Sequence, residues 1–368
     1  MLWTIKSICI AGCCVLAGML KFSSSARGDD AVPEVAFVGV AHIHTPDFVG
    51  RISKRHDVKV KYVWDEDPQL AKQYAEQLKV PVAQSVEQIL SDPQIKAVII
   101  CSQTNQHLKL VTAAANAKKD IYAEKPLGMG AEDAYAMAKA IHEAGVKFQT
   151  GYFMRGEPAL QFLKEQVEKG NFGTITRIRG VNTHNGALGG WFDHEYRWMA
   201  DPKQAGIGGY GDLGTHSLDL MLWLMDQPVT KVTAVTSMGT NRYGCDELGE
   251  GILQFKGGAI GTLGAGWDDV SADPVSLEIA GTLGQAAIVN GRLYFQSSKV
   301  QGSSMRRPVA DLPAQQPHPF ELFLDAVTGK QVKLIGADEA AYRCAVMDAL
   351  YQGAKESKWV DVQQPSAQ

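Results

Sequence analysis

The sequence lacks the features that define several classes of protein. Its net charge of −4 and sequence pI of about 6.2 give no strong basic field for nucleic acid, and we find no RRM, helix-turn-helix or zinc-finger pattern. Its 6 cysteines show no CxxC spacing, so we expect neither a disulfide framework nor a zinc site of that type. Beyond the N-terminal region no apolar run is long enough to cross a bilayer, and we expect no membrane span in the mature chain.

The N-terminus carries the one notable apolar run. Lys6 precedes the segment ICIAGCCVLAGML, and small residues follow at Ser24 and Ala26. This pattern predicts a signal peptide over residues 1–26 and a mature chain that starts near Arg27, exported to the periplasm or outside the cell. Three alternatives stay open: a lipoprotein cleavage site at Cys13, a short membrane-associated tail, or a mispredicted start codon. If the segment is not a signal, we expect the protein in the cytoplasm.

Strand and helix patterns alternate over residues 33–152. The strand-like runs are nearly all apolar, which is typical of a parallel sheet covered by helices on both faces. The predicted strands are residues 35–40, 58–65, 95–101, 120–124 and 146–152. We therefore expect an α/β domain with a doubly wound parallel sheet, in which ligands bind at the carboxyl ends of the strands.

The pattern changes over residues 153–362. Short alternating segments separated by glycine turns predict an open, mostly antiparallel sheet in a second, α+β domain. Two helical patterns, over residues 318–329 and 336–357, close the chain. We expect these last helices to pack back on the first domain.

The stretch VAFVGVAHIHTP, residues 35–46, has the form of a strand and turn that bind a dinucleotide. Gly39 supplies the tight turn, while Ala41 and His44 stand near the positions of the two further glycines that such loops usually carry. Asp65 ends the second strand at about the spacing expected for the acid that binds the adenine ribose. No arginine follows Asp65 directly, which favours NAD over NADP.

His42 and His44 are two residues apart, so a metal pair is an alternative interpretation. A metal site needs a third ligand, and none stands close in the sequence. The surroundings are those of a nucleotide loop, and we predict no metal.

Two further motifs contain groups suited to catalysis. AEKP, residues 123–126, places Lys125 at the carboxyl end of a strand, where its charge could stabilise an alkoxide. GGYGDLGTHSLD contains Asp212 and His216, four residues apart and therefore on one helix face. There an aspartate can orient a histidine that acts as a general base. The ordinary alternatives are a solvated strand-end lysine and a structural Asp–His pair.

The Gly39 turn, Asp65, the segment TNQH, AEKP and GGYGDLGTHSLD occur in an order and spacing that resemble the Gfo/Idh/MocA family of oxidoreductases, from Val35 to Val362. The resemblance implies a Rossmann domain followed by a domain with an open sheet, a nicotinamide cofactor, a sugar or polyol substrate, and a homo-oligomer. It also implies that Lys125, Asp212 and His216 form the catalytic set, with His216 as the base. The cofactor-binding residues that we predict are Gly39, Ala41, His42, Ile43, His44, Asp65, Ser102, Thr104, Asn105, His107, Glu124 and Lys125.

Residues 182–202 follow the first strand of the second domain and are rich in groups that bind hydroxyls. Loop structure is the plain alternative for each of them. The substrate-binding residues that we predict are Arg155, His184, Trp191, Asp193, Arg197 and Trp198, together with Asp212 and His216.

Three functions are consistent with these motifs. The first is an NAD-dependent oxidoreductase that takes a hydride from a sugar or polyol. The second is a glycosidase or lyase that oxidises its substrate transiently and returns the hydride, a reaction that suits an exported protein because free NAD is scarce outside the cytoplasm. The third is a non-catalytic sugar-binding protein, although a sensor has no need of the lysine, aspartate and histidine together.

Overall fold

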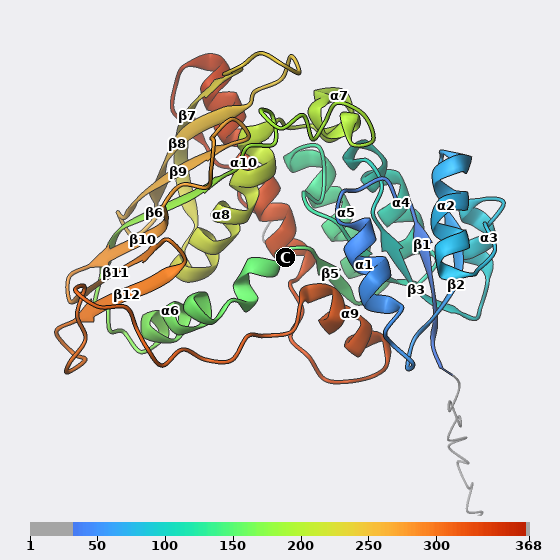
Figure 1. Cartoon of the computed structure of the whole chain (residues 1–368), viewed down its shortest axis with the longest axis horizontal. Helices are drawn as coiled ribbons and strands as arrows, with labels where there is room; N and C mark the ends of the chain where they lie inside the picture. Colours follow the sequence, from blue (N-terminus) through green and yellow to red (C-terminus); the bar gives the residue numbers. More distant parts are fainter. Residues whose placement is uncertain (1–31, 366–368) are drawn as a thin grey trace, which may run out of the picture. The chain divides into compact units, whose positions relative to one another are not determined.

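The computed structural model describes residues 32–365, and the predicted signal peptide lies outside the described residues. The first sheet has five parallel strands in the order β2-β1-β3-β4-β5 (Figure 1). Its strands are β1 (Glu34–Val38), β2 (Lys59–Trp64), β3 (Ile95–Ile100), β4 (Asp120–Ala123) and β5 (Phe148–Thr150). The order reverses at β1, so the loop after β1 lies at the point where α/β sheets bind ligands.

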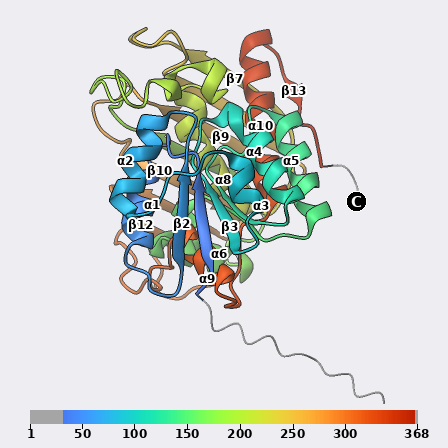
Figure 2. The same ribbon diagram turned by 90° about the vertical axis from the view of Figure 1, so that its right-hand side faces the viewer.

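Helices cover both faces of this sheet, as predicted. Figure 2 shows α1 and α2 on one side of the strands and α4 and α5 on the other. Along β1, Val35 and Phe37 pack in one hydrophobic cluster while Ala36 and Val38 pack in the other, because successive side chains point to opposite faces. The helices are α1 (Thr45–Ile52), α2 (Pro68–Leu78), α3 (Val86–Ser91), α4 (Thr104–Asn116) and α5 (Ala131–Ala144).

The second sheet has eight strands in the order β12-β11-β10-β6-β9-β8-β7-β13, and every neighbouring pair is antiparallel except β6 with β9. Helix α8 (Gly209–Met225) packs on β6 and β9. The strands are β6 (Ile175–Thr183), β7 (Val229–Ser237), β8 (Leu248–Phe255), β9 (Ile260–Gly266), β10 (Val275–Gly281), β11 (Gly284–Val289), β12 (Arg292–Ser297) and β13 (Val360–Asp361). The remaining helical elements are η1 (Phe153–Gly156), α6 (Pro158–Glu168), η2 (Arg197–Ala200), α7 (Pro202–Ala205), α9 (Pro319–Val327) and α10 (Ala337–Glu356).

The last two helices return to the first sheet. Phe320 and Phe323 of α9 join the cluster that includes Val35, and Ala340 and Cys344 of α10 join the cluster on the opposite face. The fold therefore closes with each of the final helices on one side of the parallel sheet.

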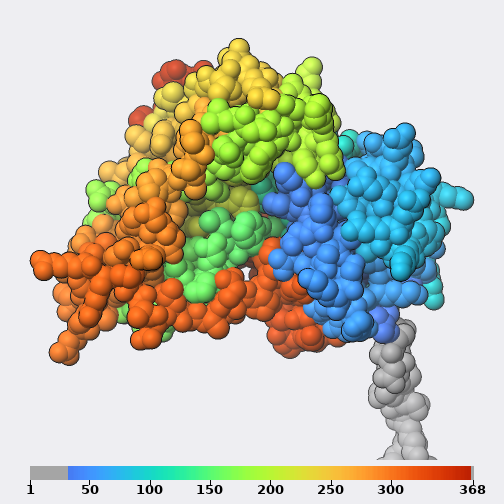
Figure 3. Space-filling view, in the orientation of Figure 1, coloured from blue at the N-terminus to red at the C-terminus, as the bar shows by residue number. Residues whose placement is uncertain are grey.

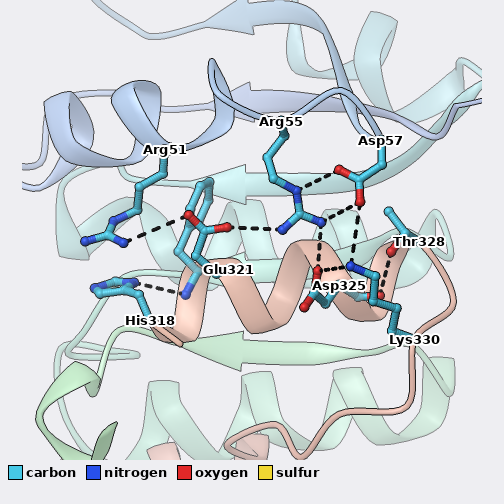
Figure 4. Close-up of polar contacts among 9 residues, drawn as sticks. Arg51, Arg55, Asp57, His318, Glu321, Asp325, Thr328 and Lys330 are labelled. Carbon is cyan, nitrogen blue, oxygen red and sulfur yellow. Dashed lines mark hydrogen bonds and ion pairs between the residues drawn. The ribbon is translucent and has the colours of Figure 1, made fainter. Parts of the chain in front are cut away.

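Ion pairs fix α9 to the end of α1, as Figure 4 shows. Arg55 contacts Glu321 at 3.1 Å and Asp325 at 2.7 Å, while it also holds Asp57 at 2.7 Å. Lys330 contacts Asp325 from the other side at 2.8 Å. Because the guanidinium is shared among three carboxylates, the network orients α9 more firmly than an isolated exposed pair would.

Within residues 32–365, no helix has both the length and the apolar character required to cross a membrane.

Candidate active site

The loop after β1 makes the tight turn that the sequence predicted. Gly39 has φ +87°, and a Cβ atom there would lie 2.5 Å from the Cβ of Ser102. Only glycine fits this turn, because the position combines a left-handed backbone with close contact to the strand end of β3.

Asp65 holds the same loop in place through hydrogen bonds from the backbone. Its Oδ2 accepts the N–H of Val40 at 2.7 Å and its Oδ1 accepts the N–H of Asp67 at 2.8 Å, and the side chain is buried. Burial raises the pKa of Asp65, against the opposing effect of these N–H groups. We predicted that Asp65 binds the adenine ribose; in the structure both of its oxygens already hold the backbone around the loop.

The backbone of the loop fits the pyrophosphate of a dinucleotide. The N–H groups of Val40, His42 and His44 have partners in Asp65, the Cys101 carbonyl and the His42 ring. Among the described residues, those of Ala41 and Ile43 have none. Helix α1 begins two residues later, so its N-terminus adds a favourable field for an anion.

We expect Gly39→Ala to weaken NAD binding by at least about tenfold and to lower the free energy of unfolding by about 1–3 kcal/mol, because the backbone at Ser102 would have to move. Calorimetric titration with NAD and urea unfolding measure the two effects. Gly50→Ala in α1 is the matched control, since a Cβ at Gly50 meets nothing within 4 Å. Equal NAD affinities for the two variants would contradict this account of the turn.

Lys125 and Asp212 form a buried ion pair between the two sheets. Lys125 directly follows the residue after β4, and Asp212 lies in the first turn of α8. The Lys125 Nζ donates to Asp212 Oδ1 at 2.8 Å, and the Trp267 Nε1 donates to the other carboxylate oxygen at 3.0 Å. Burial by itself would raise the pKa of Asp212, but the charge and hydrogen bond of Lys125 hold it well below its usual value. Asp212 is therefore ionised at neutral pH and keeps Lys125 in place.

His216 lies one helical turn beyond Asp212 and is buried. Burial first, and the charge of Lys125 second, hold the pKa of His216 well below its usual value, so its imidazole is neutral. Its Nδ1 is buried without a hydrogen-bond partner among the described residues. We expected Asp212 to orient His216, but both Asp212 oxygens bind Lys125 and Trp267 instead. The imidazole is thus a neutral group, within electrostatic range of Lys125, that can accept a proton.

Glu124 brings His42 and His44 together. The three candidate ligand atoms lie within 4.8 Å of one another, and His44 Nδ1 is 3.4 Å from Glu124 Oε2. However, His42 Nδ1 accepts the backbone N–H of His44, so the His42 proton is on Nε2, which faces Glu124. A metal bound at that nitrogen would require an imidazolate. This geometry favours hydrogen-bonded histidines around a buried carboxylate, and the absence of a metal stays a prediction.

His42 should make the protein sensitive to acid. Burial lowers its pKa from 6.5 to about 3, so at pH 5 the unfolded chain binds a proton that the folded protein does not. Stability from this group is present above about pH 6.5 and falls by about 2 kcal/mol by pH 5. We expect the pH-dependent loss of unfolding free energy between pH 7.5 and 5 to be about 2 kcal/mol smaller in His42→Gln, measured by urea unfolding. His56→Gln, at an exposed position, is the control, and an equal loss in both variants would contradict the assignment.

The other predicted cofactor residues follow β3. Thr104 is buried at the start of α4 and lines a small cavity with Lys125 and His42. His107 donates its Nδ1–H to the carbonyls of Pro126 and Leu127 at 3.2 and 3.1 Å. It therefore supports the turn that carries Lys125, with its own side chain buried.

The predicted substrate residues do not gather at one place. The His184 ring lies tilted against that of the exposed Trp191, with the ring centroids 4.6 Å apart, and it is within electrostatic range of Asp212. Asp193 binds Arg242 and Tyr243 on the outside of the loop, and Arg197 lies over the Tyr243 ring.

Arg155 and Trp198 also have other contacts than the ones we predicted. Arg155 is held by Asp219 at 2.8 Å and Glu339 at 2.9 Å. Trp198 is only 8% exposed and donates its Nε1–H to the Ala41 carbonyl at 3.0 Å, so it offers no open ring face to a sugar.

Three residues of the site were not predicted from the sequence. Trp267 follows β9 in the segment GAGWDD, and its position after a strand was the only signal available. Phe153, 37% exposed, has its ring 5.2 Å from His216 and 5.8 Å from His318. His318 caps α9, far along the chain, and no local pattern connects it with the site.

The first domain is a parallel sheet with a dinucleotide loop and a buried lysine at its edge, and the partner of that lysine comes from α8, which packs on the second sheet. This arrangement defines a two-domain nicotinamide-dependent oxidoreductase. Comparison with known families agrees: residues 34–152 match the oxidoreductase family with an NAD-binding Rossmann fold, and residues 160–287 match the GFO/IDH/MocA C-terminal domain. The chain belongs to the Gfo/Idh/MocA family. The predicted family, fold class, enzyme class and NAD cofactor are thereby confirmed.

Named relatives span much of the chain. The levoglucosan dehydrogenase of Pseudarthrobacter phenanthrenivorans is 25% identical over 367 residues, covering 83% of this chain and 90% of that protein. The myo-inositol 2-dehydrogenase of Thermotoga maritima is 28% identical over 215 residues, covering 56% of this chain and 60% of that protein. A solved levoglucosan dehydrogenase in complex with NADH and levoglucosan superposes with a TM-score of 0.75 at 21% identity, over 90% of this chain and 99% of that one.

Proposed function

We propose that this protein transfers a hydride between a hydroxyl-bearing carbon of a sugar or polyol and the nicotinamide of NAD. The observation that carries the proposal is the buried Lys125–Asp212 pair beside a neutral His216, at the carboxyl edge of the NAD-binding sheet. The names of the relatives, which include levoglucosan and inositol dehydrogenases, support a sugar or polyol substrate.

Each side chain has a distinct task in this reaction. The nicotinamide, when bound, accepts the hydride from the substrate carbon. His216 accepts the hydroxyl proton, since its imidazole is uncharged and its Nδ1 has no hydrogen-bond partner among the described residues. Lys125 donates a hydrogen bond to the oxygen and stabilises the negative charge that develops there. Asp212 keeps Lys125 oriented, and the indole N–H of Trp267 in turn fixes Asp212.

A redox-neutral glycosidase or lyase is the second candidate. In that reaction the hydride returns to the same substrate after elimination, and the cofactor has no need to leave. The contact of Trp198 with the cofactor loop favours this alternative, because it covers the loop from which NAD would dissociate.

We also propose that the protein is exported and forms a homo-oligomer. Export rests on Lys6 and the apolar run that follows it. The oligomer rests on apolar side chains exposed on the strands of the second sheet, at Val235, Ile252 and Ile260.

The test uses residues 27–368, incubated with NAD and with levoglucosan, myo-inositol and simple aldoses in turn, while the absorbance of reduced nicotinamide is followed. Net reduction with one of them supports the dehydrogenase. Bound nicotinamide in the purified protein, with no net reduction but cleavage of a glycoside, supports the second candidate. A protein that binds no nicotinamide would exclude both.

A further inference from the structure

One segment of the second domain crosses to the first domain and covers the dinucleotide loop. Residues 195–207 contain η2 and α7 and lie between β6 and α8 in the chain. The indole of Trp198, within this segment, binds the Ala41 carbonyl at 3.0 Å, and its ring is 5.9 Å from that of His42. In Figure 3 the yellow-green atoms of this part of the chain lie against the blue atoms at the start of the first domain.

Further contacts fix the segment at its far end. The side-chain amide of Asn105 donates to the Lys203 carbonyl at 3.3 Å, and α7 packs against α4. A small cavity remains beneath the segment, lined by Trp198 and Met199 from above and by His42, Thr104, Lys125 and Asp212 from below. The cavity therefore lies between the dinucleotide loop and the Lys125–Asp212 pair, and the segment covers it.

A glycine with positive φ stands near each end of the segment. Gly190, a few residues before it, has φ +70°, and Gly206, near its end, has φ +80°. Both are left-handed conformations that glycine adopts without strain. Between these glycines the segment is anchored to the first domain by the two hydrogen bonds and the buried indole, and Gly206 itself lies close to Met129.

We propose that residues 195–207 form a lid over the dinucleotide loop, with Trp198 as the positioning residue that holds it shut, so that the nicotinamide cofactor leaves only when the lid opens. This inference rests on the proposed function, since it concerns the cofactor of the same site. The carbonyl that Trp198 covers belongs to Ala41, whose own N–H has no partner among the described residues and can bind the pyrophosphate. Opening of the lid then limits the rate at which the cofactor is released, a step that often limits turnover in enzymes with lids.

The rate of NADH release tests the lid directly. The protein is loaded with NADH and mixed with excess NAD, and the loss of bound NADH fluorescence is followed. Trp198→Phe keeps an aromatic ring but removes the indole N–H, and we expect release about 3–10-fold faster than in the unmodified protein. Trp198→Ala also removes the packing, and we expect release about 100-fold faster. Trp359→Ala, at a half-exposed tryptophan far along the chain, is the control and should release NADH at the original rate.

A purely structural role for Trp198 would change stability but not release, so the urea midpoint of each variant is measured in parallel. Faster release from Trp198→Phe at an unchanged midpoint supports the lid, even if Trp198→Ala fails to fold. Release at the original rate from a folded Trp198→Phe and a folded Trp198→Ala would overturn it. A protein that binds no NADH would instead remove the proposed function and the lid with it, a result distinct from unchanged release.

Discussion

Lys125→Met should lower kcat by about 10³-fold, with the affinity for NAD changed much less. The methionine has nearly the length of the lysine side chain but no N–H donor for the oxygen of the substrate, and loss of one such donor costs about 10²–10³ in rate. The same change leaves Asp212 buried with Trp267 as its remaining partner. Its pKa would then rise, because burial is no longer opposed by the charge of Lys125.

The matched control is Lys119→Met. Lys119 is also buried and stands just before β4, at the opposite end of the same strand from Lys125. Its Nζ binds the carbonyls of Asp92 and Ile95, far from the proposed chemistry. We expect this variant to lose stability but to keep kcat. Steady-state kinetics on both, with NAD affinity measured separately, distinguishes a role at the reacting atoms from general damage. Equal losses of kcat would contradict the role assigned to Lys125.

The parallel sheet could be predicted from the sequence because the signal for each of its strands is local. The run IKAVII is almost entirely apolar, and β3 is buried on both faces for the same reason. The turn at Gly39 was equally local, since a glycine directly after an apolar strand is typical of a tight strand-to-helix turn. The structure gives Gly39 the φ of +87° that such a turn requires.

The partners of Asp212 could not be predicted in the same way. Four-residue spacing correctly places Asp212 and His216 on one helix face, but spacing says nothing of groups that arrive from elsewhere. Lys125 is 87 residues away in sequence and Trp267 is 55 residues away. The charge-assisted bond from Lys125 and the direct bond from Trp267 take both carboxylate oxygens, and His216 is left without one.

Asp65 and Trp198 have a structural role that the sequence did not indicate. We predicted contacts with a ligand for both, and in the structure each also binds the backbone of the loop, at Val40 or Ala41. Residue type and position indicate which side chains can form hydrogen bonds, whereas tertiary packing adds backbone partners that the sequence does not reveal.

A second large effect should come from Asp219, which lies one turn beyond His216. Its carboxylate is buried and accepts from Arg155 Nε at 2.8 Å and from Arg343 Nε at 2.9 Å. Asp219→Ala would leave two largely buried guanidinium groups with Glu339 as their one remaining acidic partner among the described residues. We expect the free energy of unfolding to fall by about 3–5 kcal/mol, since breaking a buried ion pair leaves uncompensated charge. Urea unfolding at pH 7.5 measures the change.

The control for Asp219 is an ion pair of the same type at the surface. Asp193 binds Arg242 on an exposed loop, and Asp193→Ala should cost no more than about 1 kcal/mol. A loss for Asp219→Ala as small as that for Asp193→Ala would mean that water reaches the two guanidinium groups. Such a result would also mean that Arg155 is accessible to a substrate. Its contacts with Asp219 and Glu339 argue against that role.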